Sequence, residues 1–96
     1  MLNIGFDNDE EAAEFLRTSK SFIFHKTIKG IEEAIENDTD IVSVANLIVK
    51  DRVIVLRVEK PKWVEHLLLA LEYFESVEDY EMCGKVKDLI DTIPQT

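Results

Sequence analysis

The chain has little cysteine, glycine or long apolar sequence, and each shortage excludes a class of protein. A single cysteine, Cys83, cannot form a disulfide within the chain. The three glycines stand apart from one another, which excludes a glycine-rich loop that cradles phosphate. No apolar run approaches the roughly 18 residues that a membrane-spanning helix needs, and the first residues do not resemble a signal peptide. We therefore expect a cytoplasmic protein that does not enter a membrane.

Basic residues are also scarce. Eleven Lys and Arg stand against 20 Asp and Glu, which leaves a formal charge of −9. Direct binding to nucleic acid or to anionic lipid requires clustered basic side chains, so neither is expected. The expected partner is a protein with a basic surface, because opposite potentials speed encounter.

Residues suited to catalysis or metal binding are few and badly spaced. The two histidines, His25 and His66, show no metal-ligand spacing with each other or with Cys83. Cys83 falls on an apolar helix face, which favours a buried, inert thiol over a nucleophile. We predict no catalytic residue, no metal, no cofactor and no enzymatic activity.

Length and composition predict a single domain over residues 1–96. A hydrophobic content of 46% is ample for a core. A domain of this size buries only roughly 60–65% of its unfolded surface, so its stability is modest. Dimerisation would add to that stability, and the sequence leaves both a monomer and a homodimer open.

The first 40 residues predict two helices. An acidic cluster opens the first, over residues 8–18, with Asp7 or Asn8 as its cap. The second, over residues 22–37, carries Ile residues at offsets of three and four. Gly30 lies inside it and costs about 1 kcal/mol relative to Ala. Either a neighbour packs closely there or the helix is weak at that point.

Two runs rich in Val and Ile follow, over residues 41–49 and 52–59, and predict an antiparallel β-hairpin. Lys50 and Asp51 form the turn between them. Both faces of the second strand are mostly apolar. We expect helices to cover one face, and the other to be partly covered or paired with a second subunit. The strand edges are open to a partner.

The last third of the chain predicts a helical hairpin over residues 61–93. Pro61 suits the first turn of a helix, Ser76–Asp79 breaks the helical pattern, and Pro94 ends it. These elements predict an α+β fold with two N-terminal helices, an antiparallel β-hairpin and a C-terminal antiparallel helical hairpin. We expect this hairpin to pack on one face of the sheet.

One stretch of the hairpin, "LEYFESVEDYEMCGKVKDLI", follows a familiar order: an aromatic–Glu pair, two small residues, a hydrophobic–Arg–Asp run and a closing Ile. The positions are Tyr80-Glu81, Cys83-Gly84, Val86-Lys87-Asp88 and Ile90, with Lys in place of Arg. This resembles the UVR motif, the helical hairpin of the excision-repair subunits UvrB and UvrC, of ClpC and of McsA. The resemblance implies a hairpin that binds proteins, often by pairing with another hairpin. Its two small residues are expected to let the helices approach closely.

We therefore predict a non-enzymatic protein–protein interaction module, an adaptor or regulator that acts through the C-terminal hairpin. The candidate partner-binding residues are Tyr73, Glu78, Asp79, Tyr80, Glu81, Lys87 and Asp88.

The alternative is an acidic inhibitor that mimics nucleic acid, with a phage anti-host or immunity-type protein as a variant of it. Size and acidity resemble those of small bacteriophage regulatory proteins. Rows of carboxylates would stand in for phosphates on a basic site. Those rows are Asp9, Glu10 and Glu14, then Glu32 and Glu36, then Glu72, Glu75 and Asp79.

Overall fold

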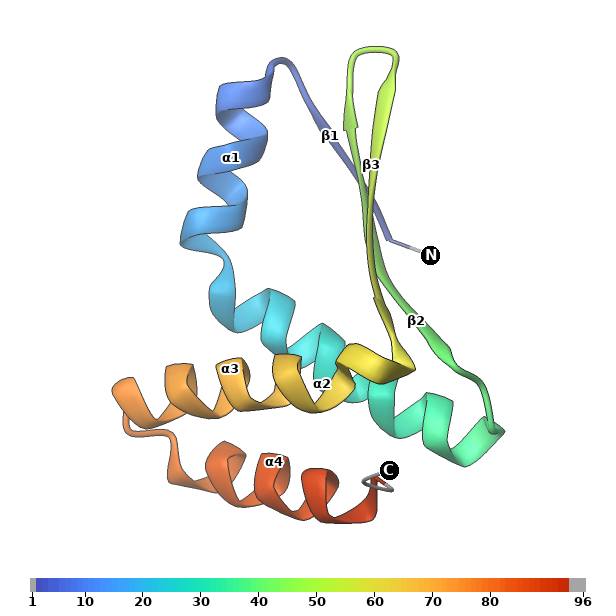
Figure 1. Ribbon diagram of the computed structural model, residues 1–96. Coiled ribbons are helices and arrows are strands. Elements are labelled where there is room, and N and C mark those ends of the chain that lie inside the picture. Colours follow the sequence, from blue (N-terminus) through green and yellow to red (C-terminus); the bar gives the residue numbers. More distant parts are fainter. Residues whose placement is uncertain (1, 94–96) are drawn as a thin grey trace.

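The computed structural model describes residues 2–93, which fold into four α-helices and a three-stranded sheet (Figure 1). The fold is α+β, as predicted. In chain order the elements are β1 (Asn3–Phe6), α1 (Asp9–Thr18), α2 (Lys20–Asn37), β2 (Ile41–Val49), β3 (Arg52–Glu59), α3 (Trp63–Ser76) and α4 (Tyr80–Thr92). A 3-10 turn, Lys60–Lys62, contains Pro61 and joins β3 to α3. Pro94, expected to end the last helix, lies outside the described residues.

The order of elements corrects the prediction at the N-terminus, because the chain opens with strand β1. β1 pairs in parallel with β2, from Asn3 opposite Asn46 to Phe6 opposite Val49. β2 and β3 form the predicted antiparallel hairpin, so the sheet is mixed, in the order β1-β2-β3. Four residues that include Asn and Gly have little β-propensity, and their pairing with distant β2 leaves no local pattern.

The ends of the first two helices follow local hydrogen-bonding rules. The side chain of Asn8 accepts a hydrogen bond from the Glu11 amide at 2.9 Å and caps α1. α2 ends where Asp38 takes a left-handed conformation, with φ of 55°. The amide of Thr39 then donates to the Ala34 carbonyl at 2.8 Å, which is the Schellman arrangement of a helix end.

The main core lies at one end of the sheet, where α2, α3 and α4 gather (Figure 1). We expected the C-terminal hairpin to pack on a sheet face. Instead it packs against α2 and the end of the β2–β3 hairpin that lies away from the turn. Helix α2 already packs against the adjoining part of β2. The largest buried side chains and the strand residues of this core are Ile28, Ile31, Val42, Val44, Ala45, Val58, Trp63, Leu67, Phe74 and Val86.

Trp63 links the strands to the helices. Its side chain is 1% exposed, and its indole Nε1–H donates to the Val58 carbonyl at 3.1 Å. A buried indole N–H requires such a partner. This bond ties the first residue of α3 to the end of β3.

The two faces of the sheet differ in their surroundings. Ile4 and Phe6 share a face with Leu47 and Val49, and the ring of Phe6 lies 5.5 Å from that of Phe15 on α1. Helix α1 therefore packs against part of this face. On the opposite face, Val53 and Val55 are 57% and 51% exposed.

Two helical glycines meet different surroundings. A Cβ atom on Gly30 would lie 2.3 Å from Cγ1 of Val42. Helix α2 and strand β2 therefore approach closely there, which is the first of the two alternatives expected for this glycine. A Cβ atom on Gly84 would meet no described atom within 4 Å. Of the two small residues expected to let α3 and α4 approach, only Cys83 is buried. The expectation for Gly84 is wrong, because this residue faces outward.

The two glycines give a matched pair of alanine variants. Gly30→Ala forces Val42 to move and should lower the free energy of unfolding by about 1–3 kcal/mol. Gly84→Ala meets open space and should raise it by about 1 kcal/mol, through helix propensity alone. Urea denaturation at one protein concentration measures both values. A destabilised Gly84→Ala variant would contradict the outward placement.

Candidate functional site: the exposed face of the C-terminal hairpin

The chain reverses direction between α3 and α4 within three residues, as the polar break at Ser76–Asp79 predicts. Glu78 adopts a left-handed conformation, with φ of 58°. Its amide donates to the Glu75 carbonyl at 3.1 Å, and the amide of Asp79 donates to the Phe74 carbonyl at 2.9 Å. This is a second Schellman motif. It folds α4 back alongside α3 (Figure 1).

Asp79 starts the next helix. Its carboxylate accepts a hydrogen bond from the Met82 amide at 3.2 Å, and its side chain is half-buried. A carboxylate at this position also interacts favourably with the helix dipole. Asp79, one of the candidate partner-binding residues, therefore stabilises the start of α4.

The cap can be tested on stability. Asp79→Ala removes the acceptor for the Met82 amide and should lower the free energy of unfolding by about 1 kcal/mol. Asp79→Asn keeps an acceptor oxygen and should lower the free energy of unfolding by only a few tenths of a kcal/mol. Urea denaturation monitored by circular dichroism distinguishes the two. Equal losses for both variants would show that the hydrogen bond does not hold α4.

Tyr73 also contributes to packing. Its ring is half-buried and lies 5.4 Å from the ring of Phe24 and 5.3 Å from that of Phe74. A groove of about 340 Å³ runs beside it between α2 and α3. Its lining residues are Lys20, Phe24, Leu69, Glu72, Tyr73 and Ser76. Tyr73 therefore lines this groove and also packs against the core.

Three of the candidate residues share the outward face of α4. Tyr80, Lys87 and Asp88 are exposed, and offsets of three, four and seven or eight residues place side chains on one side of a helix. Cys83 and Val86 are buried on the other side. Two helical turns separate Tyr80 from Lys87, about 10 Å along the axis.

Gly84 lies in the middle of this outward face. It follows Tyr80 by four residues and precedes Lys87 by three, so the helix backbone is bare between a phenol and an ammonium group. Glycine in a helix interior costs about 1 kcal/mol relative to alanine, and its packing within the described residues offers no compensation. A partner could approach the backbone closely here. We call Tyr80, Gly84, Lys87 and Asp88 the α4 face.

The remaining two candidates are Glu78, in the turn before α4, and Glu81, at the border of this face. Glu78 is exposed and adopts the left-handed conformation in the turn. Glu81 is exposed and points about 100° away from Tyr80 around the helix axis, but it precedes Gly84 by three residues and Asp88 by seven, so it borders the α4 face on the Asp88 side.

Three exposed apolar residues of the hairpin were not among the predicted candidates: Leu68, Leu69 and Val77. The signal was present for the leucines. Three consecutive leucines cannot all point inward at 3.6 residues per turn, and only Leu67 of the three is buried. These residues add apolar area around the hairpin.

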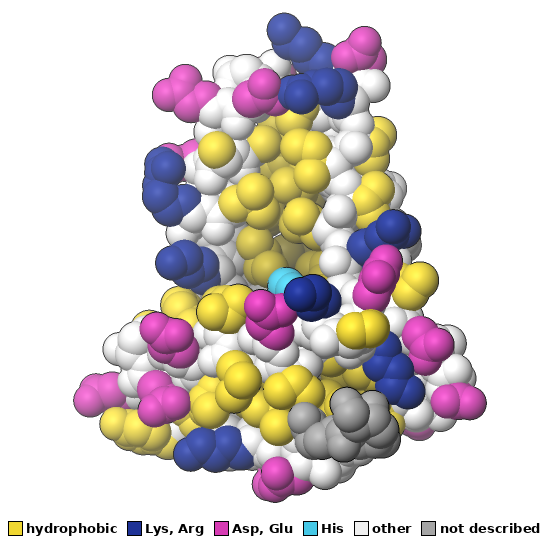
Figure 2. All heavy atoms as spheres, viewed as in Figure 1, with side chains coloured by type: hydrophobic (Ala, Val, Ile, Leu, Met, Phe, Trp, Pro, Cys, Tyr) yellow, Lys and Arg dark blue, Asp and Glu magenta, His cyan; other side chains and the backbone are white. Residues whose placement is uncertain are grey.

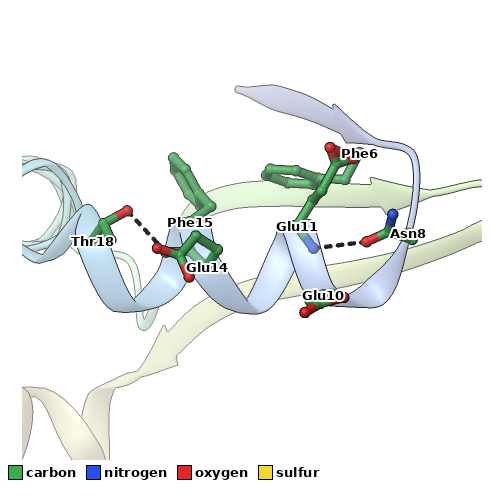
Figure 3. A pocket seen from close by; sticks show the side chains of 7 residues that line it. All are labelled: Phe6, Asn8, Glu10, Glu11, Glu14, Phe15 and Thr18. Atoms are coloured by element: carbon green, nitrogen blue, oxygen red, sulfur yellow. Dashed lines mark hydrogen bonds between the residues drawn. The ribbon is translucent and has the colours of Figure 1, made fainter.

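A second concave region lies along α1. A groove of about 550 Å³ is lined by Phe6, Asn8, Glu10, Glu11, Glu14, Phe15 and Thr18 (Figure 3). Figure 3 shows the rings of Phe6 and Phe15 beside each other, with Glu10 directed away from them. Glu11 accepts from the Asp7 amide at 3.0 Å, and Glu14 pairs with Arg17. The carboxylates of Glu11 and Glu14 thus interact with α1 and the residues just before it.

Hydrophobic side chains also gather in a hollow between α1 and the sheet, with charged side chains around its rim (Figure 2).

Charge is unevenly distributed along the chain. Residues 41–62 hold five Lys or Arg and two Asp or Glu, whereas the rest of the chain holds six basic and 18 acidic residues. The β2–β3 hairpin together with the 3-10 turn after it is therefore a basic region in an acidic protein.

Among residues 2–93, no helix has the length and apolarity to cross a bilayer. Nor do three His, Cys, Asp or Glu side chains of the described chain come together in a group that could hold a metal ion.

Comparison with known protein families, with characterised proteins and with solved structures finds no match.

Proposed function

We propose that this chain is a non-enzymatic protein-interaction module that binds its partner through the α4 face. The observation that carries the proposal is Tyr80. Its side chain is 68% exposed, the largest fraction among the big apolar side chains of the described residues. It stands beside a bare stretch of helix backbone at Gly84.

The chemistry of the α4 face suits a helical partner. Tyrosine adds a large contact area with only two rotatable side-chain bonds, and it is enriched among residues that dominate binding energy. Gly84 lets a partner helix approach the α4 backbone. Lys87 and Asp88 supply charges that can fix its register. The likeness to the UVR motif supports the same proposal, since such hairpins pair with other hairpins.

Charge adds to the description of the partner. Outside residues 41–62 the chain carries 18 acidic and six basic residues, so the helices present a negative surface. A partner with basic residues around a central apolar groove would associate fastest.

The alternative, a nucleic-acid mimic, has less support. Several carboxylates of its expected rows contact cations of the same chain: Asp9 pairs with Arg52, Glu14 with Arg17, and Glu32 with Lys85. Such pairs break a continuous row of negative charge. We therefore retain the interaction module as the proposed function.

The α4 face can be tested by capture from a lysate of the native host. The double variant Tyr80→Ala/Lys87→Glu removes the anchor and reverses one charge. We expect it to lose partner binding by about tenfold or more, because a central aromatic anchor contributes about 2 kcal/mol. Quantitative mass spectrometry of the captured proteins gives the ratio to the unmodified chain.

The matched control is Leu16→Ala/Lys29→Glu, which truncates one exposed apolar side chain and reverses one exposed charge on α1 and α2. It should capture the partner as the unmodified chain does. Circular dichroism establishes that both variants are folded. Equal capture by the α4 variant and the unmodified chain would contradict the proposal.

A further inference from the structure

The outer edge of β3 is long and open. Among the described residues the only strand beside β3 is β2, because β3 ends the order β1-β2-β3. One side of this eight-residue strand thus offers backbone donors and acceptors without a strand neighbour. Natural proteins normally protect such an edge, since another chain can pair with it.

The usual protections are missing from the middle of β3. Edge strands are commonly blunted by a central charge, a proline or a short length. Here Arg52 and Arg57 stand at either side of four aliphatic residues, Val53 to Leu56. Val53, Ile54 and Val55 are 57%, 38% and 51% exposed. The centre of the edge is therefore apolar and accessible.

We propose that a second copy of this chain pairs antiparallel along β3, with Ile54 at the two-fold axis. Two identical strands related by an axis perpendicular to the sheet place the axial residue opposite itself, and opposed residues share a face. The two three-stranded sheets then become one sheet of six strands. This proposal concerns a different surface from the α4 face and stands independently of it.

Side-chain chemistry selects this register. With Ile54 on the axis, Val53 lies opposite Val55 and Arg52 opposite Leu56 of the second copy. Arg57 then lies opposite the Asp51 carboxylate, once on each side of the axis. Opposed aliphatic pairs and opposite charges each stabilise a sheet, whereas opposed like charges destabilise it. A shift that places Leu56 on the axis would instead set Arg52 against Lys60.

The surroundings of the two charged positions agree with this pairing. Arg57 is well exposed, and its ion pair with Glu59 is long, at 3.9 Å. Asp51 is exposed in the turn. The ladder in this register runs from residue 51 to residue 57. It stops before Val58, whose carbonyl already accepts from the Trp63 indole.

Sedimentation equilibrium over a range of concentrations tests the association. The monomer has a mass of 11.1 kDa, and we expect the unmodified chain to approach twice that mass at high concentration. Ile54→Lys places two ammonium groups against each other at the axis and should weaken dimerisation by at least about tenfold. The matched control is Ile35→Lys on α2, because Ile35 has the same exposed fraction, 38%. It should leave the dimer intact.

Cross-linking tests the register without relying on a disruptive variant. In a Cys83→Ala background, Ile54→Cys places two thiols on opposed residues, whose Cα separation of about 4.5–5.5 Å suits a disulfide. Arg57→Cys places them six residues apart along the strands, about 20 Å. We expect mild oxidation to link the first variant and not the second.

Three results would overturn the proposal. One is a monomer at every concentration, which would leave the edge to an extended segment of another protein. Another is a dimer that Ile54→Lys and Ile35→Lys weaken equally. The third is faster cross-linking at Arg57→Cys than at Ile54→Cys.

Discussion

The buried indole of Trp63 is the contact on which the arrangement of this small domain depends. It belongs to the main core and donates to the Val58 carbonyl near the end of β3. Because strand and helix are tied at this point, α3 begins at the end of β3, and the turn at Glu78 then folds α4 back onto α3. The main core therefore forms at one end of the molecule. Beyond this core, α1 packs against part of the sheet.

This uneven distribution of packing explains why apolar surface stays exposed. A chain of 96 residues has too few side chains to cover every face of its helices and strands. Small domains bury a smaller share of their surface than large ones. Here the core helices cover one end of the sheet. The middle of β3 and the outward side of α4 remain accessible. Both proposed interactions use surface that the fold leaves uncovered.

Much of the local structure follows from sequence patterns. The runs at residues 41–49 and 52–59 match β2 and β3, because β-branched residues between turn formers specify strands. The polar break at Ser76–Asp79 also predicts the α3–α4 turn. β1 could not be predicted, since its partner lies 43 residues away. Gly30 and Gly84 look alike in sequence, and only their neighbours in space separate a close contact from an open position.

The candidate site was predictable to a similar degree. Helical periodicity places Tyr80, Lys87 and Asp88 together, and the structure keeps them on one exposed face. The packing of Tyr73 against Phe24 depends on how α2 crosses α3. No local pattern carries that crossing, so sequence analysis grouped Tyr73 with residues that lie elsewhere.

The core around Trp63 is expected to hold the fold, whereas α1, in which only Ala12 is buried, adds less to the global stability. Native-state amide hydrogen exchange tests this claim most directly. We expect the slowest exchange at core residues of α2 and α3 such as Ile31, Leu67 and Phe74, since such amides open only on global unfolding. Amides of α1, where only Ala12 is buried, should exchange markedly faster. Equal protection of α1 and α3 would contradict the account.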